Sequence, residues 1–242
     1  MQSNEKYSQA YLRWTVNERT QHWILAISFI VLVFTGFALK YPESWWSWPF
    51  LYAGAFDLRG TLHRIAGSAY LALSFYHVWY LLFNERGRAK LQALKLRLQD
   101  IFDMKDQILH NLGKSRTVPK YGHFTYWEKF EYWALVWGTL IMAFTGLVLW
   151  FENISLQIFP LWFLDVSTVI HFYEAILATL AILVWHFYFV IFNPTVYPVN
   201  FSMFNGYITE EEMREEHAAE LEEFLTKEPE QQPEQEILTT EK

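Results

Sequence analysis

The chain has 242 residues, of which 52% are hydrophobic and 19% aromatic, and its formal net charge is −7. It contains no cysteine, which excludes disulfides, thiolate-held iron–sulfur clusters, covalently attached c-type haem and thiol catalysis. An aromatic content this high is ordinary for a membrane protein, in which Trp and Tyr gather at the interfaces with water.

Four apolar segments follow one another along the chain, and each is long enough to cross a hydrocarbon core of about 30 Å as a helix. The polar sequence between them is too short to cover four buried helices of a soluble protein. We therefore predict an all-α membrane protein with a bundle of four transmembrane helices. The predicted spans are residues 20–39, 62–84, 130–151 and 167–192.

The first nineteen residues are polar and do not resemble a cleaved signal peptide, so the first span is expected to serve as an uncleaved insertion signal. The segment at 41–60, between the first two spans, contains Trp45, Trp46 and Trp48. Tryptophans at this place are expected of an interfacial aromatic belt.

The loop at 84–127 is strongly basic, and the loop at 152–167 has no Lys or Arg. Cytoplasmic loops of membrane proteins carry the excess of positive charge. This predicts a bacterial inner-membrane protein whose N-terminus, basic loop and C-terminus are cytoplasmic. The nine basic residues are Arg86, Arg88, Lys90, Lys95, Arg97, Lys105, Lys114, Arg116 and Lys120.

Apolar residues recur at helical spacing within the basic loop and predict an amphipathic helix there. The helix would lie on the cytoplasmic membrane face or against a partner subunit, or it would be a solvated connection. The apolar positions are Leu91, Leu94, Leu98, Ile101 and Ile108.

The chain ends in an acidic cytoplasmic tail, residues 201–242. Thr209 and Glu212 form a capping-box pattern, which predicts a short helix. The Glu/Gln/Pro-rich sequence after it is predicted to be disordered. The expected organisation is therefore an N-terminal segment (1–17), a four-helix domain (18–200) and this tail.

Two parts of the chain repeat with an offset of about 110 residues. The matches are Glu18-Arg19 with Glu128-Lys129, Trp23 with Trp133, Phe34-Thr35-Gly36 with Phe144-Thr145-Gly146, and His77 and Asn84 with His186 and Asn193. We therefore predict two helical hairpins, residues 18–84 and 128–193, that repeat in parallel about an axis along the membrane normal. The two repeated glycines are expected to let helices approach closely.

Five of the eight histidines lie in or at the ends of the apolar segments: His22, His63, His77, His171 and His186. Ionisable residues inside a membrane are costly, so their default interpretation is functional. His63 and His77 are 14 residues apart, and His171 and His186 are 15 apart. Each pair therefore lies on nearly one helix face, about 21–22 Å apart along the axis. Facing imidazoles at two levels of a bundle suit two b-type haems with axial histidines.

Other roles compete with haem binding for these histidines. Any single one can simply hydrogen-bond a neighbouring helix. A zinc site needs three or four ligands in one cluster, and a proton relay needs polar residues between the two levels; neither pattern is present.

His22 competes with His77 as the partner of His186, and the repeat favours His77, because it matches His186.

Residues 13–200 resemble the di-haem cytochrome b subunits of membrane formate dehydrogenases and nickel–iron hydrogenases. The resemblance rests on QHW in the first span, LHRIAG and IHFYEA at the starts of the second and fourth, and KYG before the third. It implies a periplasmic-side haem between His63 and His171 and a cytoplasmic-side haem between His22 and His186. It favours His22, and His77 stays as the alternative.

The resemblance also implies a quinone or menaquinone at the cytoplasmic end, near the segment before the third span. Tyr121, Gly122 and His123 match that segment loosely. Arg64, and with it Arg59, is expected to pair with haem propionates, because carboxylates bind most strongly to cationic donors.

We therefore expect a membrane electron-transfer subunit with no catalytic residues of its own. It would pass electrons between a periplasmic partner, an iron–sulfur protein or a multihaem cytochrome c, and the quinone pool. It is surrounded by lipid, and no nucleic acid is expected as a partner. The alternative is a cofactor-free membrane anchor subunit of a larger complex. A transporter would want broken helices or central charges, and the sequence shows neither.

Overall fold

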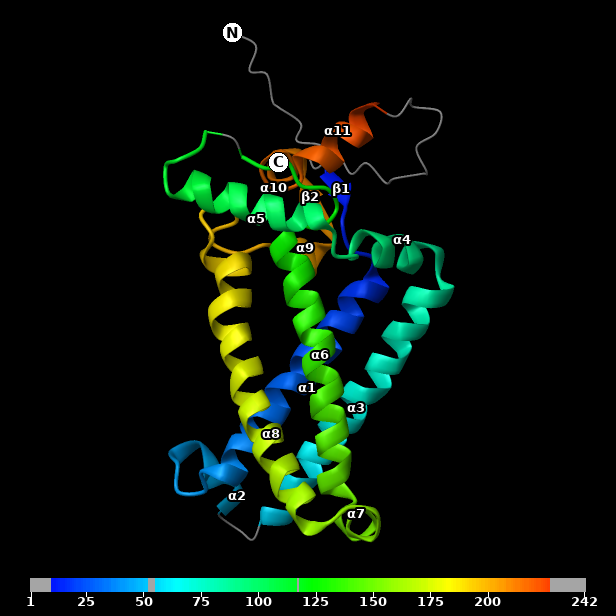
Figure 1. Ribbon diagram of the computed structural model, residues 1–242, viewed down its shortest axis with the longest axis vertical. Helices are drawn as coiled ribbons and strands as arrows, with labels where there is room; N and C mark the ends of the chain where they lie inside the picture. Colours follow the sequence, from blue (N-terminus) through cyan, green and yellow to red (C-terminus); the bar gives the residue numbers. More distant parts are fainter. Residues whose placement is uncertain (1–9, 52–54, 117, 227–242) are drawn as a thin grey trace. The chain divides into compact units, whose positions relative to one another are not determined.

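The computed structural model describes residues 10–51, 55–116 and 118–226, and nearly all of its regular structure is helical (Figure 1). The chain divides into two compact units. We call residues 1–19, 85–133 and 186–242 the polar unit, and residues 20–84 and 134–185 the apolar unit.

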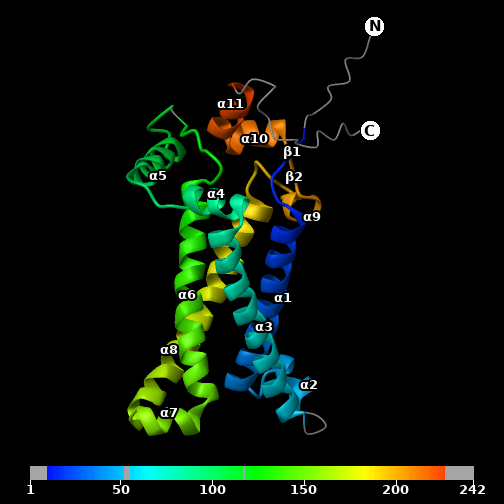
Figure 2. The same cartoon turned by 90° about the vertical axis from the view of Figure 1, so that its right-hand side faces the viewer.

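Four long helices cover the predicted spans except Asn84 and Phe151, the last residues of two of them (Figures 1 and 2). They are α1 (Val16–Lys40), α3 (Phe56–Phe83), α6 (Tyr126–Trp150) and α8 (Leu161–Leu180), the last continued by η3 (Ala181–His186) and η4 (Tyr188–Phe192). Within the described ranges, these four are the helices long and apolar enough to cross a membrane. The chain is an all-α membrane protein, as predicted.

The helices begin earlier than the predicted spans: at residues 16, 56, 126 and 161 instead of 20, 62, 130 and 167. Capping explains the difference at α1 and α6. The Glu18 carboxylate accepts from the Thr15 backbone N–H at 2.8 Å, and Glu128 accepts from that of Thr125 at 2.8 Å. Each threonine hydroxyl accepts from the glutamate backbone N–H in return. Such reciprocal caps extend a helix over polar residues that a hydropathy pattern leaves out.

Many apolar side chains on the long helices are exposed. The exposed fraction is 60% for Ile27 on α1, 75% for Phe75 on α3 and 68% for Val184 beyond α8. Monomeric soluble proteins rarely expose so much contiguous apolar surface, whereas lipid tails are as apolar as these side chains. These exposed apolar side chains are therefore suited to contact with lipid.

Helix–helix contacts within the apolar unit join the two hairpins. The hydroxyls of Tyr70 on α3 and Thr139 on α6 are 2.9 Å apart and share a hydrogen bond. The ring of Phe37 on α1 meets that of Phe172 on α8 edge to face, with centroids 6.4 Å apart. The short elements of this unit are η1 (Trp45–Ser47), α2 (Trp48–Leu51) and α7 (Glu152–Ile158).

A change of helix type follows α8. The first hairpin has 14 residues from His63 to His77, and the second has 15 from His171 to His186. The chain is α-helical throughout the first interval, but it is π-helical over Ala181–His186 and again over Tyr188–Phe192. A π turn holds one residue more than an α turn. The π segment is therefore where the second hairpin accommodates its additional residue.

The basic loop forms two helices of the polar unit, α4 (Glu85–Ala93) and α5 (Leu98–Asn111). Helical structure in this loop is confirmed, but the single predicted helix is divided in two, and Leu94 lies outside both helices. On α5, Asp100 is buried and accepts from the Lys129 ammonium at 2.6 Å. Leu98 and Ile101 on the same helix are 77% and 52% exposed. The apolar side of α5 is thus exposed, and the sequence-based alternatives of a membrane surface and a partner subunit both stay predictions.

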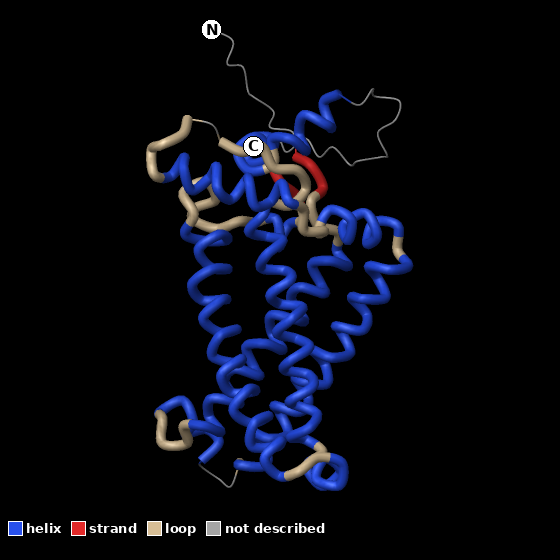
Figure 3. Tube along the Cα trace, in the orientation of Figure 1, coloured by secondary structure: helices blue, strands red, loops and turns tan. Residues whose placement is uncertain are grey.

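The start of the chain and its tail form a small two-stranded sheet, which the sequence did not predict (Figure 3). Strand β1 (Ala10–Leu12) pairs antiparallel with β2 (Tyr207–Thr209), and Tyr11 lies opposite Ile208. Strands of three residues are too short to carry a periodic signal. Helices α9 (Ser202–Asn205), α10 (Glu210–Glu216) and α11 (Ala218–Thr226) complete the tail.

The tail has its own apolar core of Ile208, Met213 and Leu221, against which Tyr11 packs. Thr209 caps α10 in the predicted capping box with Glu212, which is confirmed. The predicted disorder falls on residues 227–242, which lie outside the described residues.

Candidate haem-binding histidines and a buried polar cluster

His63 on α3 and His171 on α8 face each other in the apolar unit. Their ring centroids are 6.4 Å apart, and the ring planes make an angle of 64°. An imidazole nitrogen binds a first-row metal ion at about 2 Å, so two imidazoles on opposite sides of one ion have centroids roughly 6 Å apart. The two rings thus have the separation of a bis-imidazole metal site.

Thr35 determines which nitrogen of His63 carries the proton. The Thr35 hydroxyl donates its one hydrogen to the backbone oxygen of Val31 at 2.6 Å. It lies 2.8 Å from Nδ1 of His63, so it can only accept there. Nδ1 is therefore protonated, and Nε2 carries the lone pair that a metal needs.

The second hairpin repeats this arrangement at equivalent positions. The Thr145 hydroxyl donates to the Ile141 backbone oxygen at 2.7 Å and accepts from Nδ1 of His171 at 2.9 Å. Both threonines are only 3% exposed. The repeated Thr-Gly pair therefore serves the histidine of its own hairpin, a role that the sequence analysis missed although the repeat itself marked both positions.

The glycine after each threonine lies against the same imidazole. A Cβ atom added to Gly36 would lie 3.5 Å from Cε1 of His63, and one added to Gly146 would lie 3.3 Å from Cε1 of His171. At each glycine, the helix therefore lies close to the ring of the histidine on the neighbouring helix.

The histidines at the far ends of the hairpins also bond through Nδ1. In the apolar unit, Nδ1 of His77 donates to Oε1 of Gln21 at 2.7 Å. In the polar unit, Nδ1 of His186 donates to Oε1 of Glu131 at 2.6 Å. Gln21 and Glu131 are equivalent in the repeat, since they are 110 residues apart. Sequence analysis missed both acceptors, although Gln21 directly precedes His22, which it discussed.

His22 and its counterpart Tyr132 pack alike. The His22 ring meets Trp23 at 5.3 Å and 84°, and the Tyr132 ring meets Trp133 at 5.5 Å and 85°. His22 and His77 belong to the apolar unit and His186 to the polar unit. The pairing of His186 with one of them stays a prediction.

The predicted propionate partners lie on α3. Arg64 follows His63 directly, and its guanidinium lies 5.7 Å from the ring centroid of Trp150 on α6. Arg59 is one turn earlier on the same helix. Their role toward haem carboxylates stays a prediction.

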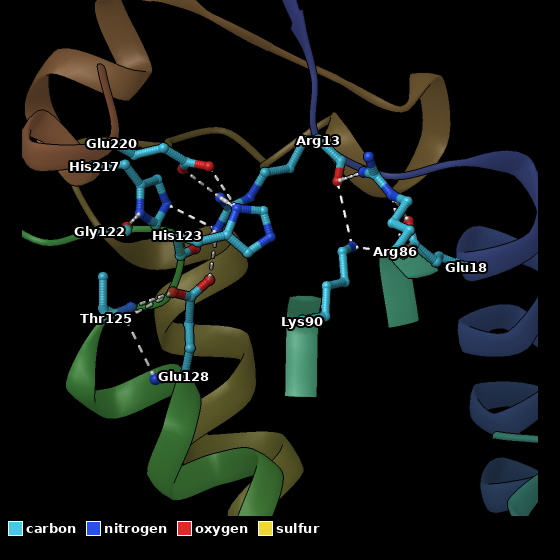
Figure 4. Close-up of polar contacts among 10 residues, drawn as sticks. All are labelled: Arg13, Glu18, Arg86, Lys90, Gly122, His123, Thr125, Glu128, His217 and Glu220. Carbon is cyan, nitrogen blue, oxygen red and sulfur yellow. Dashed lines mark hydrogen bonds and ion pairs between the residues drawn. The ribbon is translucent and has the colours of Figure 1, made fainter. Parts of the chain in front are cut away.

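A buried polar cluster lies in the polar unit around Arg13, whose side chain is 4% exposed (Figure 4). Its guanidinium contacts Glu220 of the tail at 3.0 Å and Glu128 of α6 at 3.6 Å. It also donates to Nε2 of His217 at 3.2 Å. Burial first, and then the nearby Arg13, lower the pKa of His217 to about 4, so this ring is neutral and accepts from the arginine.

A second group of charges lies beside Arg13 in Figure 4. The Lys90 ammonium contacts Glu18 at 2.9 Å, and Arg86 contacts the same carboxylate at 3.2 Å. Burial lowers the pKa of Lys90 to about 7, and the Glu18 carboxylate opposes that shift. These ion pairs join α4 to the start of α1 within the polar unit.

The residues predicted to approach a quinone also lie in the polar unit, where they hold neighbouring segments. The Tyr121 hydroxyl donates to Gln107 of α5 at 3.0 Å, and the Gly122 backbone oxygen accepts from Nδ1 of His217 at 2.8 Å. Nδ1 of His123 contacts Glu220 at 2.5 Å. Their role toward a quinone stays a prediction.

Two paired imidazoles whose Nδ1 atoms bond threonines, in a helical protein with four candidate spans, are an arrangement typical of membrane haem proteins. Residues 13–206 match the family model of the prokaryotic cytochrome b561, and the chain belongs to that family. It is therefore a membrane cytochrome b, and the family implies b-type haem.

The chain is similar to the cytochrome b556(fdo) subunit of formate dehydrogenase from Escherichia coli strain K12. The identity is 23% over 148 residues, which are 60% of this chain and 63% of the relative. The same subunits of E. coli O6:H1 and O157:H7 match to the same extent. The match thus spans less than two thirds of the length of these curated relatives.

Proposed function

We propose that this cytochrome b subunit holds two b-type haems and passes electrons between a periplasmic redox partner and membrane quinone. One haem is proposed between His63 and His171. The other is proposed on His186 together with His22, with His77 as the alternative. Bound haem iron supplies one-electron transfer.

The observation that carries the proposal is the pair of threonine-anchored imidazoles 6.4 Å apart. His63 and His171 would hold the haem iron through Nε2, because Nδ1 of each ring donates to a threonine and leaves the lone pair on Nε2. Apolar helices around the rings exclude water and lower the local dielectric, which is one of the protein's means of setting a haem potential. Arg64 and Arg59 are proposed to bind the propionates.

Quinone exchange is proposed at the cytoplasmic end, with Tyr121, Gly122 and His123 in the segment that approaches the ring. The sequence resemblance supports this, and hydroxyl, backbone and imidazole groups are suitable partners for quinone carbonyls. Because these groups also contact α5 and the tail, quinone affinity is expected to respond to changes in the tail.

The partner is proposed to be a periplasmic iron–sulfur protein or multihaem cytochrome c of an oxidoreductase complex. Similarity to a formate dehydrogenase subunit supports a complex of this class. The proposed orientation in the inner membrane, with both termini in the cytoplasm, follows from the nine basic residues of the 84–127 loop.

The test is the haem content of the purified full chain in detergent, with reduced-minus-oxidised spectra. We expect two b-type haems per chain, and the loss of one in His63→Ala and in His171→Ala. His110→Ala, which removes an imidazole from α5, is the matched control and retains both. If His22→Ala keeps both haems and His77→Ala loses one, His77 is the ligand. If the unmutated chain shows no b-type absorption, it is a cofactor-free anchor and the proposal is wrong.

A further inference from the structure

The two hairpins hold equivalent histidines with acceptors of different charge. His77 donates from Nδ1 to the neutral amide of Gln21 at 2.7 Å, within the apolar unit. His186 donates from Nδ1 to the carboxylate of Glu131 at 2.6 Å, within the polar unit. Because Gln21 and Glu131 occupy the same position of the repeat, the difference between them is chemical and not one of placement.

A carboxylate acceptor changes what an imidazole gives to a metal. A hydrogen bond to an ionised acceptor is roughly twice as strong as one to a neutral acceptor. It draws the Nδ1 proton away, leaves more electron density on Nε2 and raises the basicity of the ligand. Ferric iron carries one more positive charge than ferrous iron, so a more basic ligand and a nearby anion both favour the oxidised state.

We propose that Glu131 is a positioning residue that fixes the ring of His186 and lowers the midpoint potential of the iron bound to that histidine. This inference rests on the proposed function, because it takes His186 as a haem ligand. The side chains of His186 and Glu131 are 26% and 28% exposed, so the pair is shielded from most of the water that would weaken the effect. Glu131 thereby sets the potential of this haem apart from that of the haem between His63 and His171, where threonine hydroxyls are the acceptors.

The experiment is a spectroscopic redox titration of the purified full chain and of Glu131→Gln, which gives the second hairpin the acceptor of the first. We expect both haems to be retained, one midpoint potential to shift to a more positive value and the other to stay. Glu131→Asp keeps the charge, so the potential of the affected haem in this variant is expected to lie between its values in the unmutated chain and in Glu131→Gln. If Glu131→Gln loses a haem, the Asp variant carries the test: its potential must lie above that of the unmutated chain, because the shorter side chain weakens the bond.

The matched control is Glu222→Gln, which removes one negative charge from an exposed ion pair with Lys120 in the same unit. It is expected to move neither potential, and an equal shift in this variant would overturn the proposal. The proposal also fails if Glu131→Gln keeps two haems with unchanged potentials while His186→Ala loses one. A chain that binds no haem would instead refute the proposed function, so the two failures are distinguishable.

Discussion

Thr35 and Thr145 act on the imidazoles beside them through a single hydroxyl each. Because that hydroxyl donates its hydrogen to the backbone oxygen four residues earlier in its own helix, it must accept from histidine. A buried serine or threonine that bonds its helix in this way is common and by itself carries no information. What gives these two a function is the second bond, which fixes the histidine tautomer and the direction of Nε2.

Removal of these hydroxyls is expected to weaken haem binding more than folding. In Thr35→Val and Thr145→Val the shape is kept, but Nδ1 loses its acceptor. Loss of the hydrogen-bond partner of a metal-binding histidine typically costs about 10- to 100-fold in affinity. Haem titration into the apo-protein checks this. Thr139→Val is the control, because Thr139 bonds Tyr70 and no histidine. Equal haem affinity in all three variants would contradict the expectation.

At the scale of elements, the two hairpins are repeats that differ, among other changes, in two features near their histidines. The histidines are 14 residues apart in the first hairpin and 15 in the second, and the acceptor Gln21 of the first is Glu131 in the second. The insertion is taken up in the π-helical segment Ala181–His186, since the matching interval on α3 is regular α-helix. Single-turn π insertions are frequent at functional sites. Here the insertion ends at a histidine that is proposed to bind haem.

Deletion of Leu183 is expected to be tolerated, because the shortened segment can become α-helical with the 14-residue spacing of the first hairpin. Deletion of Ser74, at the corresponding place in α3, leaves 13 residues and rotates the later part of that helix by about 100° per residue removed. We therefore expect two haems per chain after the first deletion and fewer after the second. Loss of haem in both variants would show that the π segment is not where the additional residue is absorbed.

Two neighbouring residues of the tail, Glu216 and His217, change their pKa values in opposite directions on folding. Burial raises the pKa of Glu216 from 4.5 to about 7, whereas burial and Arg13 lower that of His217 from 6.5 to about 4. Between pH 4.5 and 6.5 the unfolded chain holds its proton on His217, and the folded chain holds it on Glu216. Each state then binds about one proton at the two sites together, so their effects on stability nearly cancel.

Single substitutions are expected to reveal the two effects with opposite sign. Glu216→Gln leaves the lowered pKa of His217, so docking of the tail should weaken, relative to the unmutated chain, as the pH falls from 6.5 towards 4. His217→Gln leaves the raised pKa of Glu216, so docking should weaken as the pH rises from 4.5 to 7. Hydrogen exchange of the α11 amides measures both. If the protection of these amides changes with pH in the same direction in both variants, this account is contradicted.

At the scale of the whole chain, polar and apolar sequence alternate in a way that assigns every segment to water or to lipid. The four spans carry exposed apolar side chains, whereas the polar unit gathers the buried ion pairs of Arg13, Lys90 and Lys129. Charges cost several kcal/mol each when buried alone, and in this unit each of these cations has a carboxylate within hydrogen-bonding distance or close to it.

The absence of cysteine makes the predicted orientation directly testable. Lys114→Cys places a thiol in the basic loop, and Asn153→Cys places one in α7, where the side chains are exposed in both cases. A membrane-impermeant thiol reagent added to intact spheroplasts is expected to label Asn153→Cys alone, and Lys114→Cys only after lysis. Labelling of Lys114→Cys in intact spheroplasts would reverse the proposed topology.

The sequence by itself determined the helical class, the four spans, the repeat and the positions of the histidines along the spans, because hydropathy and spacing are properties of consecutive residues. It did not reveal the acceptors of those histidines. Thr35, Thr145, Gln21 and Glu131 meet their imidazoles from another helix, 26 to 56 residues away, and periodicity records only which face a residue occupies.

The tertiary structure alone decided the contacts between distant parts of the chain. Strands β1 and β2 pair across most of the sequence, and Arg13 meets Glu220 at a separation of 207 residues. No local pattern anticipates such contacts, because they depend on which polar groups remain without a partner once the helices have formed. Local sequence thus fixes the helices and places the histidines along them, and folding supplies the hydrogen bonds that give each imidazole its tautomer.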